Sequence, residues 1–372
     1  MFKNLTRIGR SWPIAGLVAA ATAAALPSAT LAQIAPPLKI GFVYVTPIGE
    51  AGWTYQHEQG RLEMQKALGS KVQTTIVESV PEGADAERVI RDLAIQGNRL
   101  IFATSFGYLE PVLRVAAEHP GVRFEHAGGY KTAANVNTYN ARYYEARYLA
   151  GLLAGRTSRS GIAGYVAAFT VPEVVQGVNA FALGMRAVNP KAVVKVLWLN
   201  TWFDPPRERE AALSLIHQGA DVLTNHSASP AVAQAAQASF KSGGVRVISY
   251  QGDMRAYAPD AQLAAVTSHW GGYYTRVAQA VLDGRWQARP VWGGIKDGMV
   301  ALSAIATDVP ADVRALLDAR RQAIVTGRLR PFSAPLTDNQ GRVRLARGAL
   351  SDAAIQKMDW FVQGVEGSVP TR

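Results

Sequence analysis

Cysteine is absent from the 372-residue chain. Without a thiol the protein can have no disulfide framework, no cysteine nucleophile and no thiolate-ligated zinc or iron–sulfur site. The first predicted strand is not followed by Gly-x-Gly-x-x-Gly, and the chain has no Gly-x-Ser-x-Gly, His-Glu-x-x-His or Walker A sequence. These absences argue against the chemistries that those motifs support. We therefore expect no catalytic residue, no metal and no cofactor.

The N-terminal apolar run, residues 14–26, has only 13 residues, well short of the roughly 20 that a membrane-spanning helix needs. It follows the basic residues Lys3, Arg7 and Arg10, and small residues follow it up to Ala32. This order is typical of a secretory signal peptide, predicted here over residues 1–32 with cleavage near Ala32. No cysteine follows the run, so we expect no lipid anchor and a protein that is free in the periplasm.

Hydrophobic residues make up 48% and charged residues 18% of the chain, as in a globular protein of two domains. Removing the three basic residues of the signal peptide lowers the formal net charge from +11 to +8. The remaining basic residues are interspersed with acidic ones. This pattern indicates a solvated basic surface and favours no nucleic-acid partner.

Strand-like and helix-like patterns alternate along the chain, which predicts an α/β protein with two doubly wound Rossmann-like lobes and a hinge. We expect residues 38–141 in lobe 1 and residues 142–268 in lobe 2, with parts of 269–372 in each. The predicted strands are 38–45, 72–78, 99–104, 122–126, 161–167, 193–199, 221–224 and 245–250. The predicted helices are 54–68, 85–96, 109–118, 142–155, 172–188, 207–218, 230–241 and 272–283.

Aromatic and hydrogen-bonding residues follow the predicted strands of both lobes, where open α/β sheets bind their ligands. The candidate ligand-binding residues are Trp53, Thr54, Tyr55, Phe106, Tyr108, Glu110, Trp202, Phe203, Asn225, Asp253, His269 and Trp270. Of the adjacent Trp202 and Phe203, we expect one to face the ligand and one the core. Flat rings with a few polar groups predict a flat heteroaromatic ligand.

Several short segments, in this order, resemble the basic membrane protein family. They are Glu50-Ala51-Gly52-Trp53-Thr54 with Gly60, Glu118–Phe124, Tyr148–Gly151, Gly219–Val222, Gly294–Met299 and Met358–Trp360. The family comprises substrate-binding proteins of ABC importers of the purine nucleoside receptor type. The resemblance covers nearly the whole mature chain. It implies a monomeric type I periplasmic binding protein that closes on a purine and delivers it to an ABC permease in the inner membrane.

The resemblance also implies roles for single residues. Trp53 would stack on the base beside the polar Thr54, and the second stacking ring would come from Trp202-Phe203. Glu110 would read the base edge, and Asp253 would bind a ribose. This chain has His269-Trp270 where the family has its ribose-binding lysine. If Trp270 fills the space of the sugar, a free base such as adenine is favoured over a nucleoside.

Other interpretations remain open. The same fold can bind a purine nucleoside, or another small polar solute such as a sugar, an amide or an amino acid. An exported enzyme acting on nucleosides would need paired carboxylates, but no motif pairs Glu50, Glu110, Asp204 or Asp253. A DNA-binding repressor with this two-lobe core disagrees with the predicted signal peptide.

Overall fold

The computed structural model describes Gly9, Ser11 and residues 36–370. The predicted signal peptide, residues 1–32, lies outside the described residues apart from Gly9 and Ser11. No helix within the described residues is both long enough and apolar enough to cross a membrane. Residues 37–370 contain two lobes, each built on its own sheet.

The sheet of the first lobe has the strand order β2-β1-β3-β4-β5-β11, and all its strands are parallel. The strands are β1 (Leu38–Val43), β2 (Val72–Val77), β3 (Leu100–Ala103), β4 (Arg123–Ala127), β5 (Val136–Ala141) and β11 (Val291–Gly293). The helices of this lobe are α1 (Trp53–Leu68), α2 (Ala84–Ile95), α3 (Leu109–Glu118) and α8 (Gly271–Leu282). The short 3₁₀ helices of this lobe are η1 (Gly69–Lys71) and η2 (Phe106–Tyr108).

The second lobe repeats this order as β7-β6-β8-β9-β10-β12, with β15 beyond β7. Its strands are β6 (Ile162–Ala167), β7 (Val193–Trp198), β8 (Val222–His226), β9 (Arg246–Tyr250), β10 (Gln262–Ser268), β12 (Val300–Ser303) and β15 (Val365–Glu366). Within this sheet of the described residues, only β12 runs antiparallel to its neighbour. The helices are α4 (Tyr143–Thr157), α5 (Pro172–Val188), α6 (Pro205–His217), α7 (Ala231–Gly243), α9 (Ala311–Val325) and α10 (Asp352–Ile355). A small antiparallel pair, β13 (Leu336–Thr337) and β14 (Val343–Leu345), follows α9.

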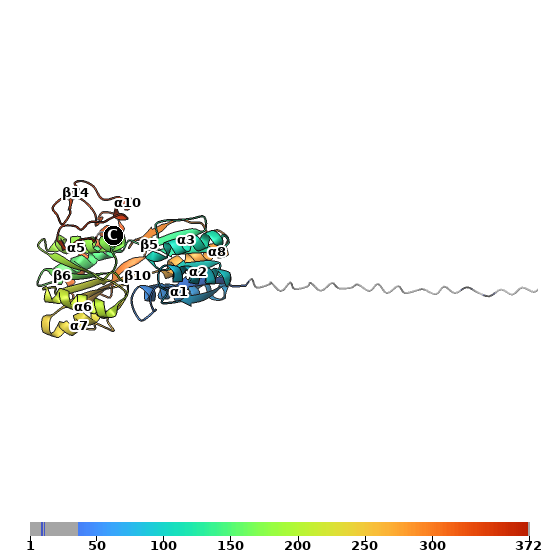
Figure 1. Ribbon diagram of the computed structural model, residues 1–372, viewed down its shortest axis with the longest axis horizontal. Helices are drawn as coiled ribbons and strands as arrows, with labels where there is room; N and C mark the ends of the chain where they lie inside the picture. Colours follow the sequence, from blue (N-terminus) through green and yellow to red (C-terminus); the bar gives the residue numbers. More distant parts are fainter. Residues whose placement is uncertain (1–8, 10, 12–35, 371–372) are drawn as a thin grey trace, which may run out of the picture. The chain divides into compact units, whose positions relative to one another are not determined.

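The chain passes between the lobes after β5, after β10 and after β11. In Figure 1, α1, α2, α3 and α8 gather in one lobe and α5, α6 and α7 in the other, with β5 and β10 labelled between them. The predicted α/β architecture with two lobes is confirmed. The exact lobe boundaries remain a prediction.

Burial explains why the strands formed where the apolar runs predicted them. Ile40, Phe42 and Val43 of β1 are fully buried, and burying a large apolar side chain contributes roughly 1.5–3 kcal/mol. The strand β5, in contrast, lies where the sequence pattern predicted none. Its run Val-Asn-Thr-Tyr-Asn-Ala is mostly polar, so it lacks the apolar signature of a buried parallel strand.

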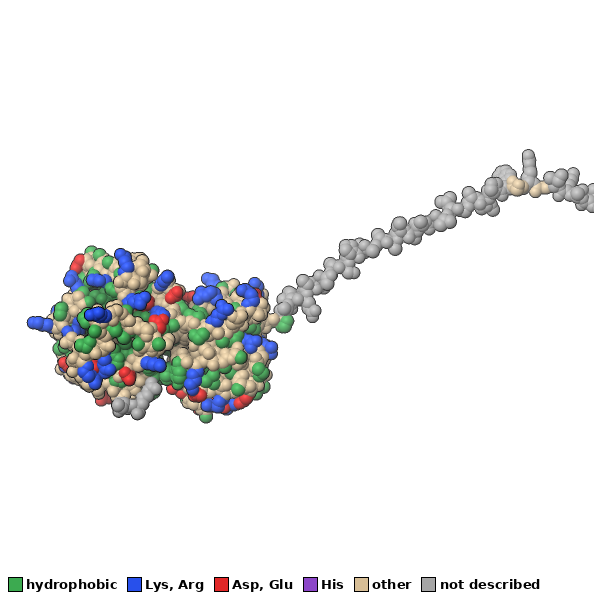
Figure 2. All heavy atoms as spheres, turned by 90° about the horizontal axis from the view of Figure 1, so that it is seen from above, with side chains coloured by type: hydrophobic (Ala, Val, Ile, Leu, Met, Phe, Trp, Pro, Cys, Tyr) green, Lys and Arg blue, Asp and Glu red, His purple; other side chains and the backbone are tan. Residues whose placement is uncertain are grey.

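Charged side chains are distributed over the surface. Figure 2 shows Lys and Arg side chains scattered over one face of both lobes, among acidic and apolar ones. On this face the basic side chains form no single stripe.

Candidate functional site

The carboxyl ends of strands from both sheets meet around one cavity, called here the central cavity. It encloses about 570 Å³ of space between protein atoms, including its opening to solvent. Doubly wound sheets bind ligands at this edge, where the strand order reverses. The first lobe lines it with Val45, Thr46, Trp53, Ser105, Phe106, Ala127 and Gly128, and the second with Val171, Glu173, Trp202, His226, Ser227, Ala228, Tyr250 and Gln251.

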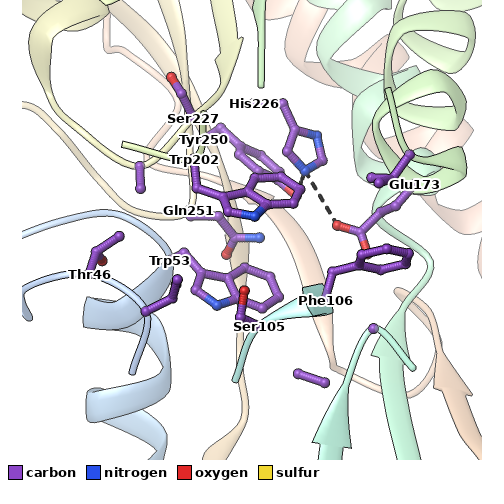
Figure 3. Close-up of a pocket in the computed structure, with 15 residues that line it drawn as sticks. Thr46, Trp53, Ser105, Phe106, Glu173, Trp202, His226, Ser227, Tyr250 and Gln251 are labelled. Carbon is purple, nitrogen blue, oxygen red and sulfur yellow. Dashed lines mark hydrogen bonds and ion pairs between the residues drawn. The ribbon is translucent and has the colours of Figure 1, made fainter. Parts of the chain in front are cut away.

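Aromatic rings come to this cavity from both lobes (Figure 3). Trp53 begins α1, and its indole Nε1 donates to the carbonyl oxygen of Thr104 at 2.6 Å. That bond satisfies the polar edge of the ring. From the other lobe, Trp202 follows β7 and packs edge-on against Phe169, with 4.9 Å between ring centroids. The cavity therefore has fixed π-faces on both sides.

Hydrogen bonds join the two lobes, and two of them involve residues that line the cavity, Trp202 and Gln251. The Trp202 indole Nε1 donates to Glu82 Oε1 at 3.2 Å. The backbone nitrogen of Gly52 donates to the carbonyl oxygen of Gln251 at 2.7 Å. Tyr257 adds a third bridge, because its hydroxyl donates to Glu50 Oε2 at 3.1 Å. Each bond joins one lobe to the other, so this is a closed arrangement of the two lobes.

Glu173 is the only acidic residue that lines the central cavity in the described part of the chain. It stands in the first turn of α5, where a helix dipole favours negative charge. Asn140 Nδ2 of β5 donates to its Oε2 at 2.7 Å. His226 Nε2 lies 3.3 Å from its Oε1, the pair joined by a dashed line in Figure 3.

His226 is a neutral partner. Burial lowers its pKa below the ordinary value, outweighing the opposite effect of Glu173, so the imidazole carries no charge near pH 7. The Tyr250 hydroxyl lies 3.2 Å from its Nε2. Behind Tyr250, the fully buried Arg147 lies with its Cζ 3.8 Å from the ring centroid and donates to Thr224 Oγ1. These contacts fix the wall that Tyr250 forms.

Of the predicted site residues, Trp53, Phe106 and Trp202 line the central cavity. Phe203, adjacent to Trp202, is 39% exposed, so it is not the core residue that we expected from this pair. Glu110 is also at the surface, where its carboxylate accepts from Lys131 Nζ at 2.5 Å. Lys131 lowers the pKa of Glu110.

Three further predicted residues are buried and bonded within the protein. Thr54 Oγ1 lies 2.6 Å from Thr46 Oγ1. The hydroxyl of Tyr108 donates to the carbonyl oxygen of Val80 at 2.5 Å. Asn225 Nδ2 donates to the carbonyl oxygen of Ser227 at 3.0 Å. None of Thr54, Tyr108 and Asn225 is among the residues that line the central cavity.

The remaining four predicted residues, Tyr55, Asp253, His269 and Trp270, line a different cavity. This second cavity encloses about 710 Å³, including open solvent, and its lining includes Glu50 and Glu63. The Asp253 carboxylate accepts from Arg255 and from Gln262 Nε2, the latter at 2.7 Å. Trp270 is 1% exposed and stacks on His57 with 5.0 Å between ring centroids.

Sequence reasoning did not include Glu173, Tyr250 or Gln251 among the candidates. Tyr250 and Gln251 stand at the end of a predicted strand, which is the signal that could have selected them. Glu173 gave no such signal, because an acidic residue in the first turn of a helix is common for purely structural reasons. Among the described residues, no group of three or more His, Asp or Glu side chains could hold a metal ion.

Comparison with known proteins gives a consistent result. A family model described as ABC transporter substrate-binding protein, PnrA-like, matches residues 38–325. A purine-binding protein of Brucella abortus is 47% identical over 334 residues, which cover 90% of this chain and 94% of that protein. A Haloferax volcanii protein whose name describes it as an ABC transporter glucose-binding protein is 36% identical, over 89% of this chain and 81% of that protein.

Solved structures share the fold. A solute-binding protein of an ABC transporter from Aeropyrum pernix K1 superposes with a TM-score of 0.69 at 18% identity, over 80% of this chain and 94% of that chain. A solute-binding protein of an ABC transporter from Conexibacter woesei superposes with a TM-score of 0.64 at 24% identity, over 79% of this chain and 98% of that chain. The predicted type I periplasmic binding protein fold is thereby confirmed.

Proposed function

Because the chain belongs to the family of PnrA-like ABC transporter substrate-binding proteins, we propose that it binds a purine between its lobes, with a free base such as adenine preferred over a nucleoside. The family and the solved structure from Conexibacter woesei are described as binding proteins of transporters, and the Brucella relative is named for binding rather than for catalysis. The observation that carries the proposal is the convergence of aromatic rings from both lobes on one cavity with a single carboxylate. The relative at 47% identity, which is named for purine binding, supports the same ligand class.

The direct contacts that we propose are stacking on Trp53 and Trp202, with Phe106 covering an edge of the base. Stacking of a base on an aromatic side chain contributes roughly 1–3 kcal/mol. Two such faces and a few polar contacts can together supply the roughly 8 kcal/mol of a micromolar complex. The indole nitrogens of both tryptophans are bonded to protein acceptors, so their faces are available to a ligand.

Ligand binding would shift an equilibrium between open and closed lobes. A ligand that touches both lobes interacts better with the closed state, and it favours closure by that difference in affinity. The bonds from Gly52 to Gln251 and from Trp202 to Glu82 belong to the closed state. The closed monomer would then dock on an inner-membrane permease, which imports the purine. We propose that residues 1–32 direct export and that the mature protein works unlipidated in the periplasm.

A second candidate ligand is a sugar, because a relative at 36% identity is named for glucose binding and sugars also pack on tryptophan. The experiment is to denature the purified protein and to identify any released small molecule by mass and ultraviolet absorbance. A purine, with its strong ultraviolet absorbance, supports the proposal. A released hexose that does not absorb would favour the second candidate.

A further inference from the structure

Glu173 has an unusual position for a carboxylate. Its side chain is 20% exposed, and it borders a cavity whose other walls are mostly aromatic and aliphatic. A carboxylate only accepts hydrogen bonds, and its two oxygens offer about four lone-pair sites. Asn140 and His226 each approach one oxygen. Acceptor capacity therefore remains for a ligand that supplies an N–H group.

The two partners of Glu173 fix its orientation from opposite lobes. Asn140 Oδ1 accepts from the backbone nitrogen of Ala141 at 2.8 Å, which directs its Nδ2 toward the carboxylate. His226 is held by its contact with Tyr250, and it is neutral, so it does not cancel the charge of Glu173. A negative charge held in a low-dielectric site interacts strongly with a donor placed against it.

We infer that Glu173 selects the free base by accepting a hydrogen bond from the imidazole-ring N–H of the purine. This inference rests on the proposed function. A free purine carries that proton on N9 or N7, whereas a nucleoside has its sugar on N9 and no ring proton there. A nucleoside bound in the same orientation would leave the carboxylate without its donor and would press the sugar against it. Sites that lose a hydrogen-bond partner in this way discriminate strongly.

The test is calorimetry with adenine and 9-methyladenine on the full mature protein after removal of endogenous ligand. We expect the wild-type protein to bind adenine at least about tenfold more tightly than 9-methyladenine, since a hydrogen bond to a charged group is typically worth that much. Glu173→Gln should weaken adenine binding about tenfold or more and bring the two affinities to within about threefold of each other. Glu118→Gln, which removes an exposed carboxylate on α3 that is paired with Arg91, should leave the affinity ratio of the wild type unchanged.

Two results would overturn the inference. One is equally tight binding of 9-methyladenine and adenine by the wild-type protein. This measurement does not depend on the folding of any variant. The other is a folded Glu173→Gln protein that keeps the wild-type preference. If the wild-type protein binds neither compound, the proposed function fails as well. If it binds both equally, only the role of Glu173 is wrong.

Discussion

The indole Nε1 of Trp202, which lines the central cavity, lies 3.2 Å from Oε1 of Glu82, so a ring of one lobe donates to a carboxylate of the other. The same oxygen accepts from Ser105 Oγ at 2.5 Å and from the backbone nitrogen of Gly107 at 2.9 Å. Glu82 is thus fixed by its own lobe before Trp202 reaches it. In the open state that we propose, the lobes separate and this contact breaks.

Replacing Glu82 with alanine should therefore speed ligand release. The loss of the interlobe hydrogen bond costs the closed state about 1 kcal/mol, which corresponds to a rise of about fivefold in the dissociation rate. Stopped-flow tryptophan fluorescence measures that rate. Asp85→Ala, which removes a nearby exposed carboxylate on α2, is the control. Equal dissociation rates in Glu82→Ala and wild type would mean that the contact does not stabilise closure.

Gly52 offers a steric test of the same closure. Its φ is 99°, and a Cβ at this position would lie 2.3 Å from the carbonyl oxygen of Ala228 in the other lobe. Gly52→Ala should lower ligand affinity at least about tenfold, because the added Cβ would clash with the Ala228 carbonyl oxygen when the lobes are closed. The roughly 1–3 kcal/mol of strain at a positive φ is present in open and closed lobes alike and should affect mainly stability. Titration by calorimetry measures the effect.

Gly49→Ala is the matched control for Gly52→Ala. Gly49 also has a positive φ, of 58°. A Cβ added at Gly49 would have the carbonyl oxygen of Ala51 as its nearest neighbour, 3.8 Å away in the same loop. This variant bears backbone strain without an interlobe clash. If both variants lose affinity equally, local strain rather than blocked closure is responsible.

Trp53→Ala should remove one stacking face. We expect ligand affinity to fall about 10- to 100-fold, while thermal unfolding remains a single cooperative transition. Trp198→Ala, a ring that stacks on Phe361 and is not part of the cavity lining, should retain wild-type affinity. An unchanged affinity in Trp53→Ala would show that the ligand does not use this face.

Glu125 should make stability depend on pH. Burial raises its pKa from 4.5 to about 7, even though Tyr273 and Trp286 donate to its carboxyl oxygens at 2.6 and 2.8 Å. The folded state thus holds a proton that the unfolded state loses near pH 4.5. The stability that this proton provides is present at acid pH and is lost as the pH rises toward 7 and beyond.

The measurement is the free energy of unfolding by urea, from pH 5 to pH 8, for wild type and Glu125→Gln. His126 gives the opposite slope, because burial lowers its pKa to about 4, so the informative quantity is the difference between the two proteins. Relative to the variant, wild type should lose stability as the pH rises, by up to about 3 kcal/mol in total. If the difference in unfolding free energy between wild type and Glu125→Gln does not change with pH, the Glu125 carboxyl is not buried in its neutral form.

The α/β fold could be predicted because most of the buried strands carry an apolar run and helices such as α2 and α3 carry an amphipathic pattern. The strand β5 was not predicted because its polar residues are hydrogen-bonded to partners elsewhere in the chain. Asn137 bonds to Glu125, and Asn140 bonds to Glu173. Such pairing depends on the tertiary structure, and local periodicity does not report it.

The candidate site was only partly predictable. Trp53 and Trp202 follow strands, and they face the same cavity. Asp253 and His269 also follow strands, yet they line the second cavity. The direction in which a loop turns after its strand depends on contacts such as that between Gly52 and Gln251. Position along the chain therefore selects residues such as Trp53 and Trp202, but it neither divides the candidates between the two cavities nor finds Glu173, which stands at the start of a helix.

Binding of a free purine base between the lobes is measured by calorimetric titration of the mature, ligand-stripped protein with adenine, adenosine and glucose under identical conditions. We expect saturable 1:1 binding of adenine with a micromolar or lower dissociation constant, and adenosine and glucose should bind at least about tenfold more weakly. Saturable binding of glucose without any heat from either purine would contradict this expectation.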